Sequence, residues 1–320
     1  MIYTIVGTRP NILKIDPQLK QEIINTGQHY NDNMSKIFFN DLDLPEPKYN
    51  LKCTEVGEMI DKLRIIFRKD KPTLILVFGD TNSSLAGALA GAYEKIQVAH
   101  IEAGMRSYND MPEEINRVLI DKLAKIKLCP NESSMVNLEK EKLFDGNTYL
   151  VGDPMVDTLS RFLPIKKRND NGEYILLTIH REENTNEKFL KKLFEILEDT
   201  KKKYIFPVHP RTKKVLGKLK AKNIKLIEPQ GYKEMLELES YAKKIITDSG
   251  GVQREGAWMN IPTLIIRETT EWTELVDIGS IKLTNLKELS EDIKNFKGVV
   301  TTVPNFGVNK RIRETLSRYV

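Results

Sequence analysis

Three carboxylates occupy positions from which acid–base groups could act together. Asp80 follows the apolar run Leu74–Phe78, and Glu102 follows the run Gln97–Ala99. Glu113 opens the helical segment that comes next in the chain. Because neighbouring parallel strands end at the same edge of a sheet, the three side chains can converge there. Carboxylates placed in this way can remove and return a proton, as acid–base chemistry on a sugar requires.

Each of these acids also has a purely structural explanation. Asp80 could cap the helix that follows it. Glu113 could form an ion pair with Arg117, which lies four residues later on the same helical face. For any one acid taken singly, the structural explanation is the better one. The catalytic hypothesis therefore depends on the three acids together.

A glycine-containing turn near the N-terminus is a candidate anion site. The motif GTRP, at Gly7–Pro10, follows the apolar run Ile2–Val6. There the free N–H groups of a helix start and the positive charge of Arg9 can bind an anion together. Lys14 lies one turn further along and can project toward the same anion. An ordinary strand-to-helix turn with a surface arginine explains this motif equally well.

A second such turn, TDSGG at 247–251, lies between a predicted strand and a predicted helix. Ser249, Gly250 and Gly251 offer a hydroxyl and backbone N–H groups to phosphate oxygens. Glu255, one turn into the helix, can accept hydrogen bonds from ribose hydroxyls. A capped glycine turn is the structural alternative, but the recurrence of similar turns in both halves of the chain favours ligand binding.

The chain has four histidines, and all of them lie at predicted strand ends or turns: His29, His100, His180 and His209. A lone histidine is usually structural, but four of four at such places favour a functional role. His180 and His209, which stand next to or near an arginine, are predicted to be diphosphate contacts or acid–base groups.

The composition excludes several other classes of protein. A net charge of +5, spread along 320 residues, gives no basic stripe for nucleic acid. Cys53 and Cys129 lie far apart without metal-ligand spacing, which is typical of a reducing compartment and argues against disulfide or zinc sites. No apolar run approaches the roughly 20 residues that cross a membrane. Because the chain opens on an apolar run without a basic leader, the cytoplasm is the expected location.

Several well-known motifs of nucleotide-binding proteins and hydrolases are also missing from the sequence. It contains no P-loop, no GxGxxG fingerprint and no GxSxG elbow. Nucleotide hydrolysis, dinucleotide redox chemistry and α/β-hydrolase chemistry therefore lose their usual signals.

Short apolar runs alternate with longer amphipathic stretches along the whole chain. The predicted strands are Ile2–Val6, Leu74–Phe78, Gln97–Ala99, Tyr174–Ile179, Tyr204–Val208, Ile224–Ile227, Lys244–Thr247 and Pro262–Ile266. The predicted helices are Gly57–Lys69, Pro112–Ala124, Glu187–Asp199, Lys233–Tyr241, Val252–Trp258 and Asn309–Tyr319. This alternation predicts an α/β fold with parallel sheets and right-handed crossovers.

A polar, proline-containing stretch at Arg161–Gly172 is the best candidate for a domain boundary. We therefore predict two Rossmann-like domains, at 1–163 and 173–300. In such architectures ligands bind in the cleft between the domains, at the C-terminal edges of the strands.

Eight ordered motifs then identify a family. They are GTRP with Lys14, TGQHY, GDTNSSLAGALA, HIEAGMRS, PEEINR, TIHREENT, PVHPRT and TDSGGVQREG. Together they resemble the non-hydrolysing UDP-N-acetylglucosamine 2-epimerases from Gly7 to about Glu274, and Pro304–Leu316 resembles the family's end. The resemblance implies a glycosyltransferase-B-like fold whose last helix, 309–320, returns to the first domain. It also implies a homodimer that needs no cofactor and no metal.

The resemblance implies a reaction as well. UDP-GlcNAc and UDP-ManNAc interconvert when UDP is eliminated to a 2-acetamidoglucal and added back. The implied catalytic residues are Asp80, Glu102, Glu113 and His180. The implied substrate and diphosphate contacts are Arg9, Lys14, Arg117, His209, Ser249, Gly250 and Gly251, with Glu255 on the ribose. Some family members are activated by substrate bound near the equivalents of Gln28 and His29.

Three departures from the family pattern stand out. The stretch from Pro10 to Thr26 is short, so the first helix and second strand are predicted to be trimmed. Asn11 stands where a Glu is common. Trp272 stands where many UDP-GlcNAc enzymes have Arg, which makes the chain look closer to relatives that act on other 2-acetamido sugars, such as 2,3-diacetamido uronic acids.

Other functions remain as alternatives. A hydrolysing epimerase would release UDP and free ManNAc, but Pro10 argues against it. A glycosyltransferase of the same fold would need an acceptor. A non-catalytic binder of nucleotide sugars would not need all three acids.

Overall fold

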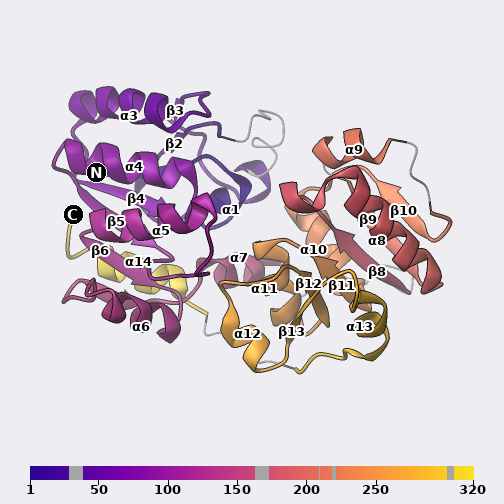
Figure 1. The fold of residues 1–320 in the computed structure, drawn as a ribbon. Coiled ribbons are helices and arrows are strands. Elements are labelled where there is room, and N and C mark those ends of the chain that lie inside the picture. The colour runs from indigo at the N-terminus through magenta and orange to yellow at the C-terminus, as the bar shows by residue number, and fades with distance from the viewer. Residues whose placement is uncertain (29–38, 163–172, 209, 218–220, 301–305) are drawn as a thin grey trace. The chain divides into compact units, whose positions relative to one another are not determined.

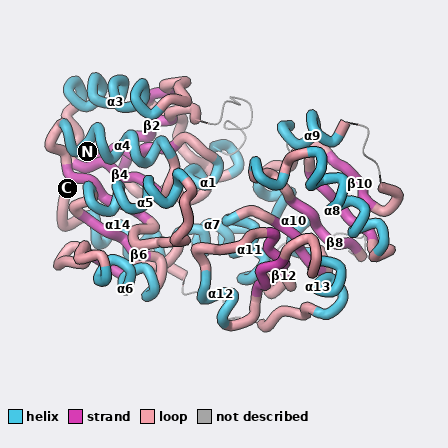
Figure 2. The backbone as a smooth tube through the Cα atoms, viewed as in Figure 1, coloured by secondary structure: helices cyan, strands magenta, loops and turns pink. Residues whose placement is uncertain are grey.

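The computed structural model describes residues 1–28, 39–162, 173–208, 210–217, 221–300 and 306–320. The chain divides into two compact units, Met1–Arg161 with Pro304–Val320, and Phe162–Val303. Each unit contains one parallel sheet wound by helices (Figures 1 and 2). The predicted α/β class with two Rossmann-like halves is confirmed.

The first unit is built on a seven-stranded sheet in the order β3-β2-β1-β4-β5-β6-β7. Its strands are β1 (Ile2–Val6), β2 (Gln21–Asn25), β3 (Tyr49–Asn50), β4 (Leu74–Phe78), β5 (Gln97–Ile101), β6 (Ile126–Cys129) and β7 (Thr148–Leu150). Its helices are α1 (Arg9–Ile12), α3 (Val56–Asp70), α4 (Asn82–Tyr93), α5 (Pro112–Leu123), α6 (Glu132–Lys140), α7 (Pro154–Phe162) and α14 (Val308–Leu316).

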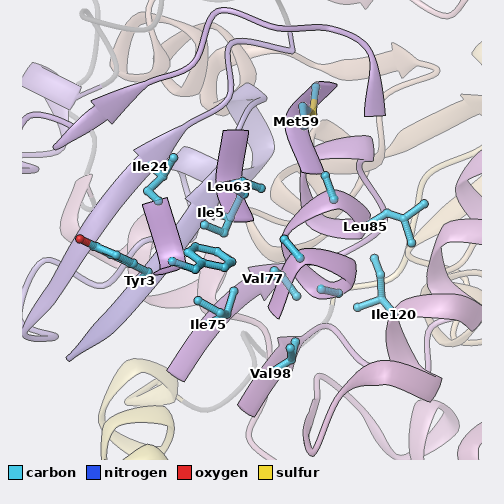
Figure 3. Close-up of a cluster of buried hydrophobic side chains, with 14 of the residues drawn as sticks. Tyr3, Ile5, Ile24, Met59, Leu63, Ile75, Val77, Leu85, Val98 and Ile120 are labelled. Carbon is cyan, nitrogen blue, oxygen red and sulfur yellow. The ribbon is translucent and has the colours of Figure 1, made fainter. Parts of the chain in front are cut away.

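A large apolar core lies between this sheet and the helices α3, α4 and α5 (Figure 3). In α3, Met59, Leu63 and Phe67 recur at the helical period and bury one face of the helix. The small side chains of α4, such as Ala86 and Ala90, are fully buried. They let this helix pack closely on the central strands β1 and β4, which set the position of the loops at the strand ends.

The C-terminal helix α14 is anchored within the first unit. The backbone N–H groups of Gly307 and Asn309 donate to the carboxylate of Asp157 at 2.8 and 2.7 Å. A carboxylate at a helix N-terminus pairs with free N–H groups and with the positive end of the helix dipole. Arg313, further along α14, forms an ion pair with Asp16.

The second unit has a six-stranded parallel sheet in the order β10-β9-β8-β11-β12-β13. Its strands are β8 (Tyr174–Thr178), β9 (Lys203–Pro207), β10 (Ile224–Ile227), β11 (Lys244–Thr247), β12 (Thr263–Ile266) and β13 (Ile281–Thr284). Its helices are α8 (Glu187–Asp199), α9 (Pro210–Leu216), α10 (Tyr232–Tyr241), α11 (Gly250–Trp258), α12 (Thr273–Asp277) and α13 (Leu289–Asn295), with a 3-10 turn at Glu182–Asn184.

Each sheet reverses its strand order once, and this reversal is where open α/β sheets bind ligands. In the first unit β1 pairs with both β2 and β4, so the reversal lies between β1 and β4. In the second unit β8 pairs with both β9 and β11. The loops that follow β1, β4, β8 and β11 are therefore the favoured places for a site.

Every predicted strand and helix is present, with bounds that shift by at most a few residues. Elements without a clear pattern were missed. The helix α4 is buried on nearly all sides and so shows no polar face. The strand β6 contains Lys127, whose ammonium group is buried and paired with Asp145. The strand β2 has five residues, as many as β1, so the predicted trimming affects the helix α1 and not the strand.

None of the helices in the described part of the chain combines the length and the apolar character that crossing a membrane requires.

A buried lysine makes the stability of the second unit depend on pH. Lys244 of β11 is 7% exposed, and its ammonium group donates to the carbonyls of Asp292 and Ile293 at the end of α13. Burial lowers its pKa from 10.5 to about 8. Between these values the unfolded chain holds a proton that the folded chain lacks, so stability rises with pH across this interval.

We predict that Lys244→Met removes this rise, because methionine has no proton to lose. The free energy of unfolding, measured in urea, should rise by about 1 to 3 kcal/mol more in the wild type than in the variant between pH 8 and pH 10.5. The exposed neighbour Lys243 serves as the control, since Lys243→Met should keep the wild-type slope. Equal slopes for wild type and Lys244→Met would contradict the prediction.

Candidate active site

The turn after β4 brings two acids and two cations together in the first unit. Gly79 has a φ of 58°, and a Cβ added to it would lie 2.8 Å from Oε2 of Glu102. Only glycine leaves room for that carboxylate. The next residue, Asp80, forms an ion pair with Arg117. The carboxylate of Glu102 forms an ion pair with Lys14. Two of the three predicted acids therefore meet at one turn, each with a cation beside it.

The pair of Lys14 and Glu102 is buried, whereas Asp80 is partly open to solvent. The side chains of Lys14 and Glu102 are 5% and 10% exposed, and that of Asp80 is 28% exposed. A buried ion pair of this kind depends on both partners, because either charge alone would be costly to bury. Lys14, predicted as an anion contact, has its ammonium group on Glu102. Glu102 also has a φ of 69°, a left-handed backbone conformation that is uncommon for a residue other than glycine.

Asp80 is not a helix cap. The cap of α4 is Thr81, whose hydroxyl accepts the N–H of Ser84 at 3.2 Å. The side-chain amide of Asn116 donates to the backbone carbonyl of Asp80 at 2.8 Å and holds the turn against α5. The carboxylate of Asp80 is thus left to pair with Arg117, and the structural explanation from capping is wrong.

The predicted ion pair between Glu113 and Arg117 is also wrong. Glu113 is exposed at the start of α5, and Arg117 pairs instead with Glu114 and Asp80. Burial alone would raise the pKa of Glu114, but hydrogen bonds from Ser107 and Arg117 lower it below its ordinary value. Glu114 therefore fastens the preceding loop to α5, and Glu113 is the acid that reaches solvent.

The first glycine turn is bound tightly to the turn of Asp80. A Cβ added to Gly7 would lie 1.9 Å from the hydroxyl of Ser83, so no other residue fits there. The amide of Asn11 donates to the carbonyl of Phe78 at 3.2 Å, and its oxygen accepts the hydroxyl of Thr8 at 3.0 Å. A carboxylate could not make that donation, which gives the Asn at this position a physical reason. Arg9 lies half-buried at the first position of α1.

Gln28 lies against the start of α4. Its side-chain oxygen accepts the N–H and the hydroxyl of Ser83 at 3.0 and 2.8 Å. His29, the other predicted regulatory residue, and His209, a predicted diphosphate contact, lie outside the described residues.

The second unit holds His180 through a buried carboxylate. Asp248 lies 2.9 Å from Nδ1 of His180 and also accepts the backbone N–H groups of His180 and Arg181. The amide of Asn184 adds a further hydrogen bond at 3.1 Å. Burial would raise the pKa of Asp248, but these bonds and the histidine lower it below its ordinary value. The carboxylate therefore stays ionised and makes Nδ1 the donor, which leaves Nε2 of the half-exposed imidazole for chemistry.

The TDSGG turn forms the start of α11, as predicted. Ser249 is the N-terminal cap, and its hydroxyl accepts the N–H of Val252 at 3.4 Å. Gly250 and Gly251 are the first two residues of the helix, so their backbone N–H groups belong to its unbonded first turn. Glu255 lies one turn further on and is buried. This end of α11 has the backbone geometry that binds anions.

Trp272 is buried and does not face solvent. The guanidinium group of Arg254 lies 4.5 Å from the centre of its ring. The backbone N–H of Trp272 donates to the hydroxyl of Thr270 at 3.2 Å. The indole therefore supports Arg254 by a cation–π contact. Arg254 in turn donates to the carbonyl of Gly250 at 3.1 Å, so Trp272 reaches the TDSGG turn through that arginine.

Several residues at these turns were not predicted to be functional. Asp248 acts by holding His180, and Glu114 acts by holding Arg117 and Ser107. These roles depend on contacts between elements that are distant in sequence. Only the pair of Glu114 and Arg117 had a local signal, because a spacing of three places both on one helical face.

We predict that Asp248→Asn changes the tautomer of His180, because the amide can present an N–H to Nδ1. Nitrogen-15 NMR above pH 9 should show the proton on Nδ1 in the wild type and a mixture of tautomers in the variant. Asn184→Ala is the control, since it removes one bond to the same carboxylate and leaves the histidine contact. An unchanged tautomer in Asp248→Asn would contradict the assignment.

Comparison with known proteins places this geometry in a family. A model of the UDP-N-acetylglucosamine 2-epimerase family matches residues 11–310. A "UDP-N-acetylglucosamine 2-epimerase homolog" from Methanococcus maripaludis is 44% identical, with 92% of each chain covered. A "UDP-2,3-diacetamido-2,3-dideoxy-D-glucuronate 2-epimerase" from Pseudomonas aeruginosa is 39% identical over 87% of this chain and 86% of its own.

Among solved structures, the UDP-GlcNAc 2-epimerase of Methanocaldococcus jannaschii, in complex with UDP-GlcNAc and UDP, is similar over 99% of both chains. Its TM-score is 0.91 and its sequence identity is 38%. The residues that the family model matches include the TDSGG turn and all of the predicted acids. The chain therefore belongs to the UDP-N-acetylglucosamine 2-epimerase family.

Proposed function

We propose that the protein interconverts UDP-GlcNAc and UDP-ManNAc by inverting C2 of the sugar. The observation that carries the proposal is the turn of Gly79, where two carboxylates, each paired with a cation, meet at the strand-order reversal of the first sheet. Membership of the 2-epimerase family supports the same reaction.

The chemistry follows from the weak acidity of the proton on C2. A carboxylate removes this proton, the electrons of the C2–H bond form the C1–C2 double bond, and the C1–O bond breaks with its electrons on UDP. UDP then adds back to C1 while an acid returns a proton to the other face of C2. Asp80 and Glu102 are the proposed acid–base groups, with Glu113 as the third acid. Arg117 and Lys14 form ion pairs with Asp80 and Glu102 and hold the two side chains in place.

The second unit is the proposed binding element for UDP. The first turn of α11, with Ser249, Gly250 and Gly251, supplies N–H groups to the diphosphate as negative charge develops on it. His180, oriented by Asp248, adds a donor or acid through Nε2. Glu255 is the proposed contact of the ribose hydroxyls.

The proposal is tested by incubating the purified protein with UDP-GlcNAc or UDP-ManNAc and separating the products. The same mixture of the two nucleotide sugars should form from either side, with free UDP remaining at trace level. Stoichiometric UDP and free ManNAc would favour the hydrolysing alternative. If neither sugar nucleotide is converted, the proposal fails.

A second substrate has a specific observation in its favour, namely the 39% identical Pseudomonas aeruginosa relative. The same assay with the UDP-2,3-diacetamido uronic acid therefore belongs beside the first. The substrate with the higher kcat/KM identifies the sugar, because kcat/KM measures discrimination in the transition state.

We predict a split between catalysis and binding in three variants. Asp80→Asn and Glu102→Gln should lower kcat by about 100-fold or more, since each removes a proton carrier. They should leave the affinity for UDP within a few-fold of wild type. Ser249→Ala should weaken UDP binding by about 5-fold to 10-fold through loss of one hydrogen bond and of a helix cap. Calorimetric titration with UDP and initial rates measure the two effects.

The exposed acid Asp61 on α3 supplies the matched control, because Asp61→Asn changes one exposed charge within a helix and outside the proposed site. The thermal unfolding of Glu102→Gln must be measured as well, because this variant leaves Lys14 buried without its ion pair. An equal loss of UDP binding in all three variants would overturn these roles.

We also propose a cytoplasmic homodimer. Both cysteines are free thiols, which suits a reducing compartment. The adjacent helices α3, α4 and α5 carry large exposed apolar side chains, namely Ile65, Tyr93, Ile115 and Leu119. Such side chains favour a subunit interface, and light scattering of the purified protein measures its mass directly.

A further inference from the structure

His100 is a fully buried histidine to which the proposed chemistry assigns no role. It lies in β5, two residues before Glu102. Its Nδ1 lies 2.7 Å from Oδ1 of Asp121 on α5, and its Nε2 lies 2.9 Å from the carbonyl oxygen of Gly79. A carbonyl oxygen can only accept, so Nε2 must donate. If Asp121 is ionised, Nδ1 must donate as well.

The surroundings of Asp121 keep it ionised. Its second oxygen lies 2.8 Å from Arg106 and accepts the N–H of Gly104 at 3.0 Å. Burial alone would raise the pKa of Asp121, but its charged neighbours lower it below its ordinary value. Of the groups that hold the carboxylate, Arg106 and the N–H of Gly104 are in place whatever the protonation of the histidine. Arg106 in turn pairs with Glu141 at 2.7 Å. Two carboxylates and one guanidinium leave one negative charge, which a protonated imidazole balances.

The other groups around the imidazole do not supply that balancing charge. On the adjacent strand β6, burial raises the pKa of Cys129 to about 12, so it is a neutral thiol. Lys127, also on β6, is paired with Asp145. On the side of Gly79, the charges of Lys14 and Glu102 cancel each other.

We propose that His100 is a positioning residue that carries a proton on both ring nitrogens and ties the turn of Asp80 to the loop of Glu102. Its Nε2 holds the carbonyl that directly precedes Asp80. Its Nδ1 holds Asp121, which fixes the loop that directly follows Glu102 through the N–H of Gly104. A neutral imidazole could hold only one of these two loops. The effect on turnover rests on the proposed epimerase activity, whereas the protonation state does not.

The protonation state is tested on the wild-type protein without any substrate. Nitrogen-15 NMR at pH 7.5 should show both ring nitrogens of His100 protonated, with the signals assigned by their loss in His100→Gln. The chain has four histidines, so the assignment is tractable. A single neutral tautomer at this pH would overturn the proposal, whatever the protein's activity.

The positioning role is tested with two variants that each keep one half of the imidazole's contacts. The amide of Asn replaces Nδ1 and keeps the bond to Asp121, whereas the amide of Gln replaces Nε2 and keeps the bond to Gly79. We expect His100→Asn to lower kcat by about 10-fold to 100-fold with KM changed less than about 3-fold, because small displacements of catalytic groups reduce turnover steeply. His100→Gln should retain more of the turnover.

Thermal unfolding and UDP titration separate this effect from a loss of folding. The proposal is overturned if both variants, when folded and able to bind UDP, keep the wild-type kcat. It is also overturned if His100→Gln is no better than His100→Asn. Wild-type protein that converts no nucleotide sugar would contradict the proposed function alone, since the NMR result stands apart from it.

Discussion

Each unit of this protein depends on one buried, ionised aspartate at the carboxyl edge of its sheet. Asp121 in the first unit and Asp248 in the second each form a hydrogen bond with Nδ1 of a histidine. Each also accepts a hydrogen bond from a backbone N–H of a neighbouring loop. A buried carboxylate without such partners would be costly, so the loss of one of these contacts would destabilise the buried charge that the others hold. The loops that carry the proposed chemistry are thereby fixed to the sheets. The two histidines differ in exposure, which separates a positioning role for His100 from a contact role for His180.

Much of the fold followed from periodicity, because apolar strands and amphipathic helices bury one definable face. The elements that escaped prediction lack such a face. The helix α4 is buried almost all round, and β13 (Ile281–Thr284) contains Lys282, whose charge is paired with Asp292. Their structure depends on partners that are distant in sequence. Local patterns do not contain that information.

The candidate site shows the same division. The acids Asp80 and Glu102 could be predicted, because the strands before them are clear and parallel strands end at one edge. Their partners could not, since the pairing of Lys14 with Glu102 joins residues 88 positions apart. The choice of Glu114 rather than Glu113 as the structural partner of Arg117 needed the helix phase and the position of Ser107. Spacing alone allowed either glutamate, because residues three and four positions before Arg117 lie on the same helical face.

The central claim is that carboxylates of the first unit remove and return the proton on C2 of the sugar. Epimerisation of UDP-GlcNAc in deuterium oxide, followed by proton NMR, tests it most directly. The account predicts that each UDP-ManNAc formed carries deuterium at C2, because the acid that protonates the other face of C2 carries a proton from the solvent. UDP-ManNAc that retains the original C2 proton would contradict the account.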